Sequence, residues 1–238
     1  MIFIITAINF LSAFLQASTG FGYAILAMFL MPMFLPYRQC SIISASLIII
    51  IAIQMCFSLR KYIRIKKVIW PLLCCLSTIW IGIYLIQILD ISTLRKIMGA
   101  FLIFLSVYFY VIKKFNICIK ETLLNGLIIG VITGLSTGMF NIVGPFLTLY
   151  FYDNMDDSLE IKANLEFSFL IAGVTSLIIN LTYIKLDEFL IQNIALSGVA
   201  AIAAGIIGLK LYYKIDKQKL KYIIIGILPL MGIVQILK

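Results

Sequence analysis

The sequence predicts an all-α polytopic integral membrane protein, and three observations predict it. Hydrophobic residues fill 63% of the 238 positions and charged residues only 12%, whereas soluble chains are about half apolar and a quarter charged. The apolar residues form continuous runs, and about 20 such residues suffice to cross a bilayer as a helix. The short alternating segments that would indicate a membrane β-barrel are missing from the sequence.

The first apolar run covers residues 2–35 and is interrupted by a polar, glycine-bearing patch at residues 16–23. It is too long for one crossing and too short for two, since one crossing takes about 20 residues. A second long run, residues 122–152, is interrupted in the same way, and both patches contain the triplet Ser-Thr-Gly, at residues 18–20 and 136–138. Two interrupted hydrophobic segments at matching places in two halves of a chain are typical of a transporter binding site.

Three ordinary apolar spans follow each interrupted run. The expected spans are residues 40–59, 68–89 and 94–112 in the first half, and 163–183, 189–209 and 220–237 in the second. An acidic loop is expected at residues 153–160, directly after the second interrupted run. The halves meet near residue 118, so we expect a first membrane repeat over residues 1–118 and a second over 119–238, both within one integrated transmembrane domain.

The distribution of Lys and Arg favours a re-entrant hairpin, or two short passes, in each interrupted run. A single crossing would divide the 19 basic residues almost evenly between the two sides of the membrane. A hairpin instead gathers most of them on one side, in the connections at residues 60–67, 113–120 and 210–221. Because cytoplasmic loops carry the excess of Lys and Arg, the hairpin is favoured. Both termini then face outward and the two halves form an inverted repeat.

The interruptions themselves predict an anion site. Backbone that leaves helical geometry at membrane depth survives only where it is buried in protein or lines a polar cavity. Gly20, Gly22 and Gly138 allow the positive φ that a break needs. The helix that restarts after each break presents free amides and a partial positive charge. Asn141 adds an amide donor, and on the triplet alignment it falls opposite Tyr23.

Polar residues of the following spans extend the predicted site, because Ser46 and Ser168 occupy matching positions in the two halves. The alternative is that Gly, Ser and Thr only let the helices pack closely. The predicted substrate-binding residues are Ser18, Thr19, Gly20, Gly22, Tyr23, Ser46, Ser136, Thr137, Gly138, Asn141 and Ser168.

Glu166 is the one carboxylate inside an apolar run. An intramembrane carboxylate is a candidate for function, and here it is a candidate carrier of a coupling proton. The alternative is a local ion pair with Lys162, four positions earlier on the same expected helix.

Pro32 follows the glycine-bearing break at residues 18–22, a serine-rich span comes next, and the second half repeats this order with Gly144 and Pro145 after its break. Over nearly the whole chain this arrangement resembles the TauE/SafE sulfite exporter (TSUP) family. The resemblance implies a secondary transporter that moves small sulfur-containing or organic anions, such as sulfite, sulfonates or sulfoacetate, across the bacterial inner membrane by alternating access. The sequence departs from the family pattern in its first break, where the usual consecutive glycines are reduced to Gly20 and Gly22, and at Asn141, where a glycine is typical.

Other function classes receive less support. The chain contains no histidine, which removes the usual ligand of zinc and haem and the commonest general base. It contains no Walker A motif for ATP, and its basic residues separate apolar runs instead of forming a nucleic-acid groove. We therefore expect no enzyme, no metal, no cofactor and no nucleic-acid partner; an anion channel, a membrane scaffold and an intramembrane enzyme are the rivals. The substrate, the direction of transport, the coupling ion and a homo-oligomeric state stay open.

Overall fold

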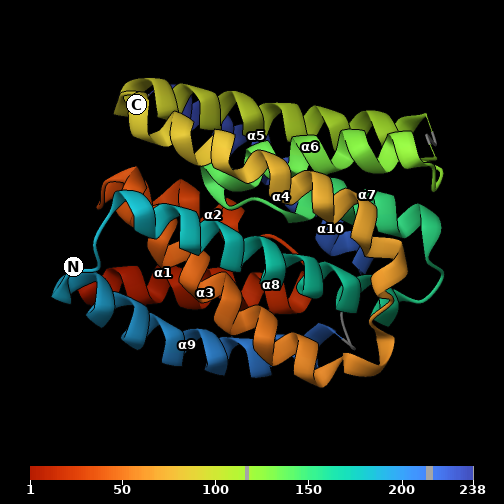
Figure 1. Cartoon of the computed structure of the whole chain (residues 1–238), viewed down its shortest axis with the longest axis horizontal. Helices are drawn as coiled ribbons and strands as arrows, with labels where there is room; N and C mark the ends of the chain where they lie inside the picture. The colour runs from red at the N-terminus through yellow and green to blue at the C-terminus, as the bar shows by residue number, and fades with distance from the viewer. Residues whose placement is uncertain (116–117, 213–216, 238) are drawn as a thin grey trace.

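The chain folds into α-helices that run along one another in a bundle (Figure 1). The computed structural model describes residues 1–115, 118–212 and 217–237, and this part of the chain contains no strand. Its helices are α1 (Ile2–Thr19), α2 (Tyr23–Leu30), η1 (Met31–Met33), α3 (Tyr37–Ser58), η2 (Arg60–Tyr62), α4 (Ile65–Ile88), α5 (Ile91–Lys114), α6 (Leu123–Phe140), α7 (Gly144–Asn154), α8 (Ser158–Tyr183), α9 (Glu188–Tyr212) and α10 (Lys217–Leu237).

Seven helices of the described chain are long and apolar enough to cross a membrane, namely α1, α3, α4, α5, α6, α8 and α9. The segment Tyr23–Met33 and the part of α10 from Gly226 to Leu237 are apolar but shorter. Large apolar side chains such as Phe3 and Phe57 lie on the outside of the bundle, where water would not tolerate so much exposed apolar surface. The predicted all-α polytopic membrane fold is therefore confirmed.

Helix packing follows a reciprocal pattern between the two halves of the chain. The broken helix of the first half, α1, packs along α9, and the broken helix of the second half, α6, packs along α4. The remaining long helices pair with their counterparts, α3 with α8 and α5 with α10. Two halves related by a two-fold axis would produce this pattern. The inverted repeat and its division near residue 118 stay predictions.

Glycines set the close approach in three of these pairs, one of which is α5 with α10, where Gly99 meets Gly232. A Cβ at Gly82 of α4 would lie 2.8 Å from the Cα of Gly138 in α6, and one at Gly208 of α9 would lie 2.6 Å from the Cβ of Ala17 in α1. Side chains at Gly82 and Gly208 would therefore force the helices apart. Helices α4 and α9 are counterparts in the two halves, and so are α6 and α1. Gly138 of α6, which meets α4, therefore corresponds to Ala17 of α1, which meets α9.

The connections that the sequence places on one side meet at one end of the bundle, called the basic end below. Three contacts join them: Arg64 to Glu160 at 3.9 Å, the amide of Ile119 to Asp153 at 2.7 Å, and the hydroxyl of Tyr212 to the carbonyl of Ser158 at 2.9 Å. At the opposite end Gln235 of α10 bonds to Tyr37 of α3 at 2.8 Å, and α1 begins there too (Figure 1). The grouping agrees with the hairpin arrangement, while the side of the membrane that each end faces stays a prediction. Residues 116–117 and 213–216 of these connections lie outside the described chain.

One predicted boundary is wrong. The expected acidic loop at residues 153–160 is largely helical, because α7 ends at Asn154 and α8 begins at Ser158. Asp157 caps α8 by accepting a hydrogen bond from the amide of Leu159 at 2.9 Å, which is the usual role of aspartate at a helix start. Asp157 therefore stabilises a helix end, and the segment does not form a long loop.

Candidate functional site

The first break lies between α1 and α2. Gly20 ends α1 in the left-handed region at φ 96° and its amide donates to the carbonyl of Gln16 at 2.7 Å. Gly22 precedes α2 at φ 113°. A residue with a Cβ adopts these angles only under strain, and the positive φ predicted for both glycines is confirmed.

The second break uses an asparagine instead of a glycine. Helix α6 continues to Phe140, Asn141 takes φ 55°, and α7 restarts at Gly144 with Pro145 in its first turn. The expectation of a positive φ at Gly138 is wrong, since Gly138 lies inside α6 against Gly82. Asparagine is among the few residues other than glycine that visit the left-handed region readily. Gly20 and Asn141 therefore end the equivalent helices α1 and α6. Aligning the two Ser-Thr-Gly triplets pairs Gly20 with Gly138 instead, which is three positions too early.

The hydroxyl groups of the predicted site are engaged with backbone carbonyls. Each is a serine or threonine that donates within or near its own helix: Ser18 to Phe14 at 2.8 Å, Thr19 to Leu15 at 2.8 Å and to Phe21, Ser46 to Ile42 at 2.9 Å, Ser136 to Ile142 at 2.7 Å, Thr137 to Thr133 at 2.6 Å, and Ser168 to Asn164 at 2.8 Å. At the breaks, such bonds supply a partner for backbone carbonyls in a dry environment, while Ser46 and Ser168 bond within α3 and α8. In this conformation the hydroxyls bond to backbone and are not among the groups that line the cavity between the two breaks.

Asn141 ties the second break to two other helices. Its amide nitrogen donates to the carbonyl of Ser41 at 3.0 Å and to the hydroxyl of Ser41 at 3.2 Å, both on α3. Its amide oxygen accepts from the hydroxyl of Ser176 on α8 at 2.8 Å. The side chain is 1% exposed, so it acts here as a clamp between α3, α6 and α8.

Charged groups hold the first break. Glu166 of α8 is fully buried and accepts a hydrogen bond from the side-chain amide of Gln16 at 2.9 Å. Its second carboxylate oxygen has no hydrogen-bond partner within the described chain. Lys162, one turn earlier on α8 and 1% exposed, donates to the carbonyl of Ala17 at 2.5 Å and lies 4.1 Å from the centre of the Tyr212 ring.

Sequence reasoning did not place Gln16 and Lys162 in the predicted site. Gln16 opens the polar patch of the first interrupted run, and Lys162 stands four positions before an intramembrane glutamate. Both signals were present in the sequence, but only the structure shows that Gln16 bonds to Glu166 and that Lys162 bonds to the carbonyl of Ala17.

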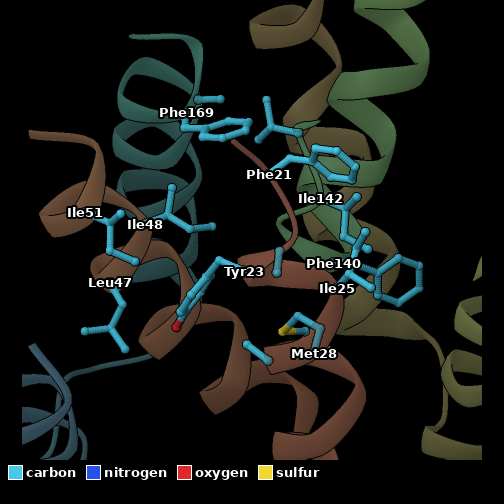
Figure 2. Packing of buried hydrophobic residues seen from close by; sticks show 14 of the residues in the cluster. Phe21, Tyr23, Ile25, Met28, Leu47, Ile48, Ile51, Phe140, Ile142 and Phe169 are labelled. Atoms are coloured by element: carbon cyan, nitrogen blue, oxygen red, sulfur yellow. The ribbon is translucent and has the colours of Figure 1, made fainter. Parts of the chain in front are cut away.

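Tyr23 lies away from the space between the breaks. Its hydroxyl donates to the side-chain oxygen of Asn9 at 2.6 Å, and Asn9 donates in turn to Ser197 at 3.3 Å. Figure 2 shows the ring beside Leu47 and Ile48 of α3. Tyr23 thus fixes α2 to α1 in this conformation.

A small cavity separates the two breaks. It is lined by Gln16, Gly22, Ala24, Ile25, Ile48, Phe169 and residues 141–145. Most of the neighbouring side chains are apolar, with Phe169 from α8, Ile48 from α3 and Ile142 from the second break (Figure 2). Of the predicted site residues, Gly22 and Asn141 are among those that line it.

The cavity contains very little free space. Its volume of about 10 Å³ is close to the smallest that holds one water molecule. A polyatomic anion does not fit into it. The structure therefore shows the two breaks packed together with little room between them, which is called the closed arrangement below.

Comparison with known proteins adds a family to this geometry. The family model described as "Sulfite exporter TauE/SafE" matches residues 5–234. No curated protein and no solved structure matches the chain. The family match extends from the first turns of α1 into α10, so it includes both breaks and the buried pair Lys162 and Glu166.

Proposed function

Since the chain belongs to the sulfite exporter TauE/SafE family and is therefore a membrane transporter, we propose that it carries a small sulfur-containing anion across the bacterial inner membrane. Sulfite, a sulfonate or a sulfoacetate-like anion is the expected substrate class. The observation that carries this proposal is the cavity between the two breaks.

Two restarting helices begin at this cavity. Gly22 precedes α2, while Gly144 and Pro145 open α7, and all three line the space. The amides in the first turn of a helix have no partner within the helix and carry a partial positive charge. Two such helix starts facing one space favour an anion without a cationic side chain inside the cavity.

The small volume of the cavity favours a carrier over the rival anion channel. A site of about 10 Å³ must enlarge before it can take a polyatomic anion, and alternating access supplies such a change of shape in each transport cycle. Saturation of flux with rising substrate concentration would identify a carrier, whereas flux that rises in proportion to concentration would identify a channel.

In alternating access, groups of helices move as rigid units relative to one another. Close contacts join helices of different halves, at Gly82 with Gly138 and at Gly208 with Ala17. Tightly packed helices shift together because close-packed interfaces do not deform continuously. We therefore expect α1 and α9 to move as one unit against α3 and α8, to which Asn141 holds the second break; this differs from a rocking of one repeat against the other.

Filling the cavity tests the proposed site. A Cβ at Gly144 would lie 2.6 Å from the Cβ of Phe21 and 3.2 Å from the ring of Phe169, so Gly144→Ala closes the space further. Sulfite flux into proteoliposomes is expected to fall by at least about tenfold, the effect of roughly 1.4 kcal/mol. The matched control is Gly226→Ala on α10, where a Cβ meets nothing within 4 Å, and it is expected to transport normally. Equal flux in both variants would reject the site.

Glu166 is the proposed carrier of the coupling proton. It is buried, and it touches the cavity through Gln16, which lines it. An intramembrane carboxylate that is not fully paired is a natural proton carrier. In Glu166→Gln the side chain keeps its shape and its contact with Gln16 but carries no exchangeable charge. Sulfite flux is expected to lose its response to an imposed pH gradient; an unchanged response in a folded variant would exclude this role.

A further inference from the structure

Lys162 and Glu166 are the buried charged side chains of the described chain. An ammonium group inside a membrane protein is costly to desolvate and marks a pathway or a site more often than a packing position. Glu166 is the proposed carrier of the coupling proton, whereas Lys162 holds the end of α1 at the first break.

The partners of Lys162 include groups that an anion can replace. Its ammonium donates to the carbonyl of Ala17 at 2.5 Å and lies over the ring of Tyr212 at 4.1 Å. Ala17 belongs to the last turn of α1, where carbonyls lack partners within the helix. Both groups are neutral. A hydrogen bond from an ammonium to an oxyanion is about twice as strong as a bond between neutral groups.

Lys162 lies between the basic end and the cavity. On one side, Ala17 adjoins Gln16, which lines the cavity. On the other, Tyr212 bonds to Ser158 at the start of α8. The neighbouring Asn164 accepts a hydrogen bond from the backbone amide of Arg64 at 2.7 Å, so the surface of the basic end begins one turn of α8 away.

The surface of the basic end carries more positive than negative charge, with Arg64 and Lys67 each within 3.9 Å of Glu160. An open depression of about 620 Å³ is lined by residues 63–67 and Glu160, and three of these residues are Arg64, Lys66 and Lys67. Glu160 is the one acidic residue among those lining it. Clefts lined mainly by one sign of charge raise the local concentration of oppositely charged ions. An anion arriving from this end therefore meets a positive surface first and the buried ammonium next.

The buried polar groups on the other side of the cavity are neutral. The buried polar groups that extend from Asn141 along α8 are Ser176 and Asn180, with Ser41 on α3. They offer hydroxyls and amides and no full charge. The positive charge near the cavity thus lies on the side of the basic end.

We propose that Lys162 is an anion subsite on the route from the basic end, where a sulfite-like oxyanion pairs with the ammonium before it enters the cavity. In the closed structure the carbonyl of Ala17 and the ring of Tyr212 occupy the ammonium in its place. The arriving anion releases the end of α1 and so loosens the first break. This inference rests on the proposed transport function and names a second position for the same substrate.

A purely structural role of Lys162 and a role as an anion subsite predict different sulfite affinities for a double variant. If Lys162 only balances the charge of Glu166, then Lys162→Met combined with Glu166→Gln removes both charges at once and restores the folding and the sulfite binding that either single change weakens. If Lys162 holds the anion, the double variant lacks the subsite however well it folds. Glu166→Gln alone leaves the ammonium without its competing carboxylate, so it should bind the anion more tightly than the unchanged protein.

The test is calorimetric titration of sulfite, sulfate and methanesulfonate into the purified full chain, with melting temperature as the check on folding. Sulfite is expected to bind several-fold more tightly to Glu166→Gln than to the unchanged protein. The double variant is expected to bind at least about tenfold more weakly than Glu166→Gln, as loss of a charged hydrogen bond implies. Lys210→Met removes an exposed lysine near the same end and should change the affinity less than twofold, or about 0.4 kcal/mol.

Each outcome decides one of the two proposals. If the double variant binds sulfite as tightly as Glu166→Gln, Lys162 is not a subsite, and the proposed function stands provided that the unchanged protein transports sulfite. If Lys210→Met weakens binding as much as loss of Lys162 does, surface charge explains the effect and the subsite is rejected. If the unchanged protein neither binds nor transports any of the three anions, the proposed function and the subsite both fall.

Discussion

The two helix breaks have the same outline but are held in different ways. The first break, at Gly20 and Gly22, is fixed to α8 through charged groups, because Gln16 bonds to Glu166 and Ala17 bonds to Lys162. The second break, at Asn141, is fixed by neutral groups, namely Ser41 on α3 and Ser176 on α8.

This difference indicates which break moves. Contacts that involve a carboxylate and an ammonium change strength when a proton or an anion arrives, whereas an amide bonded to hydroxyls and carbonyls does not respond to either. The first break is therefore expected to open and close, and the second to serve as the fixed wall of the cavity. The three substitutions below test this comparison.

Loss of the ammonium at the first break should have the largest effect. Lys162→Leu leaves the buried carboxylate of Glu166 without its neighbouring positive charge and the carbonyl of Ala17 without its donor. Breaking a buried charged pair costs about 3–5 kcal/mol, so the melting temperature in detergent should fall steeply. Adding Glu166→Gln to this variant should recover most of the loss. A double variant no more stable than the single one would show that the two charges are independent.

Loss of the amide at the second break should cost somewhat less. Asn141→Leu places a branched side chain at φ 55° and removes the partners of Ser41 and Ser176. Left-handed strain of about 1–2 kcal/mol adds to about 1–3 kcal/mol for unpaired buried groups. Asn141→Gly is the matched control, because it relieves the strain and retains only the hydrogen-bond loss. Equal melting temperatures for both variants would mean that the backbone angle contributes nothing.

The backbone of the first break should contribute least. A Cβ at Gly20 meets nothing within 4 Å, so Gly20→Ala is opposed only by its φ of 96°. The expected cost is about 1 kcal/mol, and Gly20→Asn should recover part of it because asparagine tolerates positive φ better. The measurement is again the melting temperature. A drop as large as that of Lys162→Leu would contradict the view that charged contacts, rather than the glycine, hold this break.

The fold was predictable from the sequence because its signals are local. Apolar run length identified the spans, and glycine within an overlong run located the first break. The clustering of Lys and Arg grouped the connections that meet at the basic end. These features depend on residues that are neighbours in the chain, so no knowledge of packing was needed.

The site was predictable only in outline. The repeated Ser-Thr-Gly triplet identified the two segments that contain the breaks. It paired Gly20 with Gly138, however, whereas the helix of the second half ends three positions later, at Asn141. The tether of the first break joins residues about 150 positions apart, and nothing local to Gln16 names its partner. Likewise, the sequence around Ser18, Thr19, Ser136 and Thr137 does not indicate whether their hydroxyls bond to the backbone, as they do here, or line the cavity.

An experimental structure of the protein with selenite would show whether a small oxyanion binds between the two breaks, because selenite is a heavier relative of sulfite whose selenium is located by anomalous scattering. We expect an anomalous peak in an enlarged cavity between Gly22 and residues 141–145, with α1 shifted away from α8. Selenium found only on the surface of the basic end, around residues 63–67, with the cavity still closed, would contradict this expectation.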